Sequence, residues 1–232
     1  MTTIPVGMPG LDSARSATFN NPMASEVGKL LHPGGVIVSS ISRDAQNTSD
    51  LGTLRGGVIL GKITSGAEYA PSILGMTSAN YTSGGTSLTV TAATAAEIVR
   101  RIGTSGTFTL VGAPTASGTV VSATVTFSAV NTTTGVVTVT NIGADKVAGC
   151  LVMPTDGSQT PLGMIGTPYG VRVLDIDGNA VDAFLDEFVV GGIFASERVV
   201  NWPAATNTTL VTWLLAQLNT YGKFTMATAY QQ

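Results

Sequence analysis

Apolar residues occupy both faces of one short run, LRGGVILGKIT at residues 54–64. In an extended strand, successive side chains point to opposite faces. Residues 58, 60 and 62 therefore share one face, and residues 59, 61 and 63 share the other. Because both sets are largely apolar, the run is predicted to be a strand buried on both faces. The glycines at 56, 57 and 61 allow neighbouring backbone to approach closely and the strand to bend.

Residues 82–142 are predicted to be an inserted α+β subdomain. Alternation over 86–91 indicates a half-buried strand. Thr94 and Glu97 have the spacing of a capping box, and the apolar positions 95, 98, 99 and 102 that follow lie on one helical face, which Gly103 ends. Three β-branched runs, at 107–111, 119–130 and 135–140, predict strands, the last two joined as a hairpin.

The main body resumes after residue 143. Asp177-Gly178-Asn179 lies between two alternating runs, 171–175 and 181–185, and predicts a hairpin. A second helix is expected after a cap at Thr206 or Asn207, with an apolar face and with Gly222 at its end. Residues 223–232 can add an edge strand. We treat 192–232 as a C-terminal helix and tail.

The first fifty residues follow no clear period, and prolines and glycines interrupt them repeatedly. A helical turn is expected at 25–31 and a short strand at 36–38. A segment of this kind buries too little apolar surface to order itself alone. Residues 1–50 are therefore predicted to be an extended arm that becomes ordered against a neighbouring molecule. A disordered tail up to about residue 30 is the alternative.

Charge is sparse: 11 Lys and Arg face 14 Asp and Glu, the net charge is −3, and charged residues make up 11% of the chain, against about 25% in a typical soluble domain. Mean hydropathy is +0.34. Such a surface is poorly protected against association. This favours a subunit of an assembly over the alternative of a neutral Thr/Gly-rich β domain.

The same composition argues against several partners and compartments. There is no basic patch for nucleic acid and no apolar run of the roughly 20 residues that span a membrane. The start of the chain lacks the features of a signal peptide, so assembly in a cytoplasm is expected. Cys150 is the only cysteine; it cannot form an internal disulfide and is expected to be a small buried residue.

No combination of residues predicts an enzyme. The only histidine, His32, sits in a His-Pro-Gly-Gly turn, and no Gly-x-Ser-x-Gly elbow accompanies it. One His and one Cys exclude a zinc site. The acids from Asp175 to Asp186 miss the spacing of a calcium loop. No phosphate-binding or dinucleotide fingerprint occurs, so neither a metal nor a cofactor is expected.

A second block, PTDGSQTPLGMI at residues 154–165, places an Asp-Gly turn before another apolar strand. Together, LRGGVILGKIT and DGSQTPLGMI resemble the lambda-type head decoration proteins of tailed bacteriophages. In that family a G-x-V-L-G-K-I-T strand is followed shortly by D-G-S and a further apolar strand. This chain departs from the pattern by placing a long insertion between the two blocks.

The resemblance implies a mainly β fold with two short helices, in which a small β-barrel or β-tulip-like core of short strands, residues 51–81 and 143–191, carries the inserted subdomain. It implies a homotrimer that binds the major capsid protein on the outer surface of the phage head and stabilises the lattice. In this interpretation the arm contacts the capsid and the two blocks pack together to form the core. The expected residues are Ile4, Val6, Leu11, Phe19 and Met23 in the arm, and Leu60, Lys62, Ile63, Leu162 and Ile165 in the core and trimer contact. The rival hypothesis is a tail- or fibre-associated adhesive module.

Overall fold

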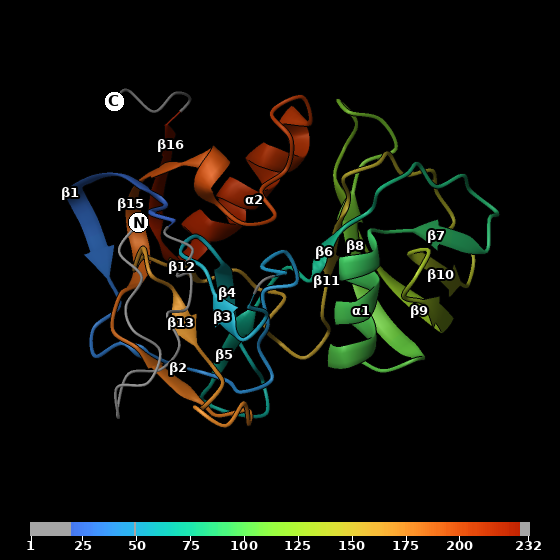
Figure 1. Cartoon of the computed structure of the whole chain (residues 1–232). Helices are drawn as coiled ribbons and strands as arrows, with labels where there is room; N and C mark the ends of the chain where they lie inside the picture. The colour runs from blue at the N-terminus through green and yellow to red at the C-terminus, as the bar shows by residue number, and fades with distance from the viewer. Residues whose placement is uncertain (1–19, 49, 228–232) are drawn as a thin grey trace, which may run out of the picture.

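The computed structural model describes residues 20–48 and 50–227 and is mainly β with two helices, as the sequence predicts (Figure 1). The strands form an eight-stranded sheet, a six-stranded sheet and a small two-stranded sheet. Both large sheets curl into half-barrels. The two-stranded sheet pairs β3 (Thr53–Leu54) with β13 (Val171–Arg172).

The first sheet has the order β1-β15-β12-β4-β5-β2-β14, with β16 also paired to β15. Its long strand β15 pairs antiparallel with β1 and β12 and parallel with β16. The predicted C-terminal strand is therefore confirmed. The bounds are β1 Met23–Leu31, β2 Val36–Val38, β4 Ile59–Lys62, β5 Tyr69–Pro71, β12 Gly163–Ile165, β14 Ala183–Leu185, β15 Phe188–Ala195 and β16 Lys223–Ala227.

Strand β4 lies in the middle of this sheet, between β5 and β12. It is antiparallel to β12, with Leu60 opposite Gly163, and the amide of Leu162 donates to the carbonyl of Leu60 at 3.0 Å. Ile59 and Leu60 are both buried, and they belong to different core clusters on the two faces. The prediction of a strand buried on both faces is thus confirmed.

The second sheet has the order β6-β11-β8-β9-β10-β7. It is wider than the range 82–142 expected for the inserted subdomain, because β6 and β11 lie outside that range and pair with each other. Helix α1 packs on it and shares a buried cluster with β8 and β9. The bounds are β6 Gly75–Met76, β7 Ser87–Thr89, α1 Ala92–Arg101, β8 Gly106–Gly112, β9 Val121–Asn131, β10 Val136–Val139 and β11 Leu151–Met153.

The predicted capping box of α1 is wrong by one turn. Thr91 is the N-cap, and its hydroxyl accepts from the amide of Thr94 at 3.1 Å. The strand-like pairing ends at Val90, which bridges to Thr77, so the helix can start earlier than the box suggests. Glu97 is consequently free of the cap and pairs with Arg100. The end of the helix is close to the prediction: Gly103 follows at φ +122°.

Helix α2 (Thr208–Tyr221) connects the two sheets. Asn207 caps it and Gly222 ends it, as predicted. Its buried residues Leu210, Leu214 and Leu218 pack in a cluster that also holds Phe194 of the first sheet and Leu151 of the second. Figure 1 shows α2 on the side of the first sheet that faces the second. The two sheets therefore share one apolar core.

The N-terminal segment differs from the prediction. Residues 25–31 form part of strand β1 and not a helical turn, because they pair with β15. Strand β2 is present as expected and pairs with β14 and β5. From Asn20 onward this segment is thus hydrogen-bonded to strands of its own chain. Residues 1–19 of the expected arm lie outside the described residues.

The centre of the first sheet should be sensitive to small cavities. Leu60→Ala removes a fully buried side chain, and we expect it to lower the free energy of unfolding by about 2–5 kcal/mol. Lys62→Ala, two positions along on the same strand, alters an exposed side chain and should change it by no more than about 0.5 kcal/mol. Urea unfolding followed by circular dichroism measures both. An unchanged midpoint for Leu60→Ala would contradict this view of the core.

Candidate interaction surfaces

The described residues show no group of side chains that could bind a metal ion. Among them, no three His, Cys, Asp or Glu side chains gather closely enough to hold a metal ion. His32 packs beside Phe188, with ring centroids 6.0 Å apart, and its buried Nδ1 has no hydrogen-bond partner in the described part of the chain. Cys150 is buried, and burial raises the pKa of its thiol. A buried thiol of this kind is a poor nucleophile.

One end of the first sheet exposes a group of apolar side chains. Strand β14 is the edge strand, and Phe184 lies opposite Ile37 of β2. Their neighbours in sequence point inward, whereas Phe184 is 62% exposed. Gly35 makes room for this ring, since a Cβ there would lie 2.7 Å from Cζ of Phe184. We call Ile37 and Phe184, which are exposed and lie opposite each other, the β14 edge patch.

The other end of the sheet also exposes apolar side chains. Strand β1 is the edge, and its pairing with β15 is interrupted by register shifts around Gly28, which has φ +80°. Bulges of this kind twist an edge strand and limit uncontrolled pairing. Val27 is 82% exposed. The charges beside it are Glu26 and Lys29, which pair with each other, and Lys29 also pairs with Glu187. We call Val27, Leu30 and Leu31 the β1 edge patch.

Both patches lie on strands that end the first sheet, and no described strand pairs with their outer edges. An edge strand presents unpaired N–H and C=O groups to another chain, and exposed apolar groups beside it supply the surface that such pairing buries. With few charges to oppose association, the two ends of the first sheet are suited to contacts with other proteins.

The residues expected to contact the capsid are placed only in part. Ile4, Val6, Leu11 and Phe19 lie outside the described residues. Met23 is 2% exposed and packs in the cluster shared by the two sheets. Its side chain is therefore part of the chain's own core and is not available to a partner.

The residues expected in the core lie mostly together. Leu60, Leu162 and Ile165 share a cluster on one face of the first sheet, Leu162 at its partly buried margin. Ile63 is buried just beyond the end of β4. Lys62 is exposed, stands opposite Tyr69 on β5 and makes no ion pair with a described residue.

Sequence reasoning missed a buried ion pair between the two sheets. Arg101, at the end of α1, is only 1% exposed at its side chain and donates from Nε and Nη2 to Asp156 at 3.2 and 2.8 Å. Asp156 also accepts from the amide and hydroxyl of Ser158. The adjacent Arg100-Arg101 pair and the Asp-Gly turn are each visible in the sequence, but nothing local links them.

Two partly or fully buried acids near this junction have pKa values shifted in opposite directions. For Asp156, burial opposes ionisation, but hydrogen bonds from Ser158 and the charge of Arg101 outweigh it, so its pKa is lowered. For Glu97, burial dominates and raises its pKa, although Arg100 and Arg101 partly offset the effect. The ion pair at Asp156 thus stabilises the contact between α1 and the DGSQ turn.

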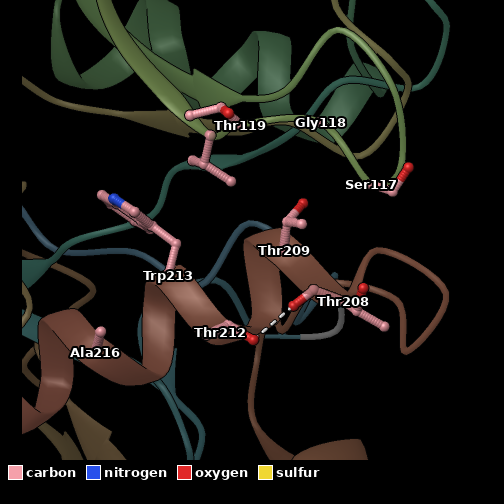
Figure 2. A pocket seen from close by; sticks show the side chains of 9 residues that line it. Ser117, Gly118, Thr119, Thr208, Thr209, Thr212, Trp213 and Ala216 are labelled. Atoms are coloured by element: carbon pink, nitrogen blue, oxygen red, sulfur yellow. Dashed lines mark hydrogen bonds between the residues drawn. The ribbon is translucent and has the colours of Figure 1, made fainter.

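A groove separates the loop after β8 from α2 (Figure 2). Its volume is about 490 Å³, and its nine lining residues carry no charge. Thr209 donates to the carbonyl of Ala116 at 3.3 Å across it, and Trp213 lines one wall. Without a titratable group, the groove can hold a neutral segment or molecule but cannot perform acid–base catalysis.

Comparisons with known proteins identify no relative: no protein-family model, curated protein or solved structure matches the chain. Among the described residues, no helix is long and apolar enough to cross a membrane.

The lowered pKa of Asp156 predicts the pH dependence of stability. Its folded pKa lies below the ordinary value of 3.8, so between these values the unfolded chain binds more protons than the folded one. The contribution of this carboxylate is therefore complete above pH 3.8 and is lost as the pH falls through the folded pKa. With Asp156→Asn, the free energy of unfolding should decrease less steeply as the pH falls below 3.8. Urea unfolding at successive pH values measures this slope.

Glu97 provides a control, because its pKa is shifted in the opposite direction. Its folded pKa is raised above 4.5, so its ionisation costs stability as the pH rises from 4.5 through the folded value. Glu97→Gln should change the slope above pH 4.5 and leave the slope below 3.8 intact. Equal slopes below pH 3.8 for the wild type and Asp156→Asn would refute the assignment.

Proposed function

We propose that the protein is a structural subunit of a tailed-phage virion that decorates the outer surface of the head and stabilises the capsid lattice. The observation that carries this proposal is the pairing of β4 with β12. The two blocks that resemble decoration proteins are separated by the inserted subdomain in sequence, yet they are adjacent strands at the centre of one sheet. This is the arrangement expected if an insertion interrupts a decoration-protein core.

The surface of the protein is consistent with attachment at several points. The β14 and β1 edge patches lie at opposite ends of the first sheet, so one subunit can contact two neighbours. In the proposed homotrimer, several such contacts act together on the major capsid protein, and avidity replaces any single tight contact. Burying apolar surface between subunits would then oppose outward pressure on the lattice.

A tail- or fibre-associated adhesive module is the second candidate. The uncharged groove of Figure 2, with Trp213 and several hydroxyls on its walls, is the observation that favours it. Quantitative mass spectrometry of purified virions separates the two functions. A decoration protein is present in many copies that follow the number of capsid subunits and co-sediments with tailless heads, whereas a tail or fibre part is present in few copies and stays with the tails.

The edge patches predict which substitutions weaken attachment. Phe184→Ser and Val27→Ser change exposed side chains, so the isolated subunit should unfold at the same temperature as the wild type. Because burying one such side chain contributes about 1.5–3 kcal/mol, at least one of the two variants should bind purified heads about tenfold more weakly. Val121→Ser, an exposed apolar position on the second sheet, is the matched control. Co-sedimentation with undecorated heads measures binding, and wild-type binding by both edge variants would exclude the edges as attachment surfaces.

A further inference from the structure

A second cavity lies between α1 and the segment 43–51 of the main body, with a volume of about 260 Å³. The α1 side supplies residues at positions i, i+3, i+4 and i+7, which share one helical face. Two of them are alanines, and their small side chains leave the space open. The lining residues are Arg43, Ala45, Thr48, Leu51, Ala93, Ala96, Glu97 and Arg100.

Three of the described arginines bind carboxylates through Nε and Nη2, whereas Arg172 binds Asp50 through Nη1. Arg55 reaches Asp44 through Nε at 2.6 Å and Nη2 at 3.1 Å. Arg101 uses the same two nitrogens toward Asp156, and Arg100 uses them toward Glu97. The Nε–Nη2 edge of a guanidinium matches the two oxygens of a carboxylate, which makes this pairing both strong and directional.

Arg43 also lines the cavity, and no carboxylate of a described residue hydrogen-bonds to it. Its Nη1 donates to the carbonyls of Ser40 and Ser42 at 2.8 and 2.6 Å, which holds the side chain in place. Its Nε and Nη2 make no hydrogen bond to any described residue. The hydrogen bonds of Nη1 thus orient the guanidinium of Arg43. Its Nε and Nη2, the two nitrogens suited to a carboxylate, remain available.

The charge around the cavity favours an anion. Arg43 and Arg100 contribute two positive charges, and Glu97, already paired with Arg100, contributes one negative charge. Burial and the nearby Arg100 both lower the pKa of Arg43, and Glu97 offsets this only in part. A further carboxylate would compensate the desolvated guanidinium, while Ala45, Leu51, Ala93 and Ala96 would contact an apolar group.

We propose that this cavity binds a carboxylate carried on a short apolar group, with the Nε–Nη2 edge of Arg43 as the recognition element. The chemistry is shared by a branched short-chain acid and by the C-terminal carboxylate of a peptide that ends in an apolar residue. The site is small: ligand pockets commonly measure about 300–1,000 Å³, so only a few apolar carbons fit beside the carboxylate.

Titration of the full chain with sodium isovalerate, followed by amide and arginine Nε–H NMR signals, tests the proposal. We expect saturable shifts at Arg43, Ala93 and Ala96. Isovaleramide, which has the same shape without the charge, should bind about tenfold more weakly or worse, because the charge-assisted pair is lost. Arg43→Lys keeps the charge but not the planar fork, and it should also lose about tenfold in affinity.

A second pair of variants leaves both arginines untouched. Ala96→Leu lies at an exposed helical position that lines the cavity and should abolish the saturable shifts by filling it, whereas Ala92→Leu, one turn earlier and outside the lining, should bind as the wild type does. Equal affinity for isovalerate and isovaleramide, or undiminished binding by Ala96→Leu, would overturn the proposal.

The source of the carboxylate is distinguished with N-acetyl-Ala-Leu and its C-terminal amide. Tighter binding of the free-acid dipeptide than of isovalerate supports a peptide terminus, and weaker binding supports a small acid. Both outcomes retain the carboxylate site. Binding of the amidated dipeptide at the same affinity as the free acid would refute it.

Discussion

The fold depends on the pairing of β4 with β12. These strands come from parts of the chain that the whole second sheet separates, and each fills the centre of the first sheet with side chains on both faces. Closing so long a loop costs conformational entropy, which the buried apolar surface of both faces must outweigh. A polar residue at Ile59 or Leu60 would therefore disturb two core clusters at once.

The inserted subdomain is not an independent appendage. Strands β6 and β11, where the chain leaves and returns, belong to its sheet, and Val111 and Leu151 pack with α2 and with Phe194 of the first sheet. The ion pair of Arg101 and Asp156 adds an oriented contact at the same junction. Breaking one partner of such a buried pair leaves an uncompensated charge, so the two sheets are expected to move and unfold together.

The protein has two contrasting kinds of surface, one apolar and one charged. The ends of the first sheet are apolar and no described strand pairs with their outer edges, which suits contacts with other protein chains. The seam between α1 and the segment 43–51 concentrates charge in a chain that has little of it. The first property supports a role as an assembly subunit. The second places the proposed carboxylate site on α1, which belongs to the inserted subdomain.

The sequence by itself determined the elements whose signals are local. The apolar run at 58–63 and helix α2 with its caps at Asn207 and Gly222 follow from periodicity and capping. The turn at Asp177-Gly178-Asn179 also forms, and one bridge closes it, from Leu174 to Ala180. The predicted hairpin does not extend beyond it, because β13 pairs with β3 and β14 pairs with β2. Tertiary structure decided the rest. Residues 25–31 became a strand because β15 offered a partner, and α1 began at Thr91 because the preceding bridge ends at Val90. Likewise, Arg101 pairs with Asp156, whereas Arg43 hydrogen-bonds to no described carboxylate. The path of the chain decides which charges become neighbours, and no local pattern encodes that path.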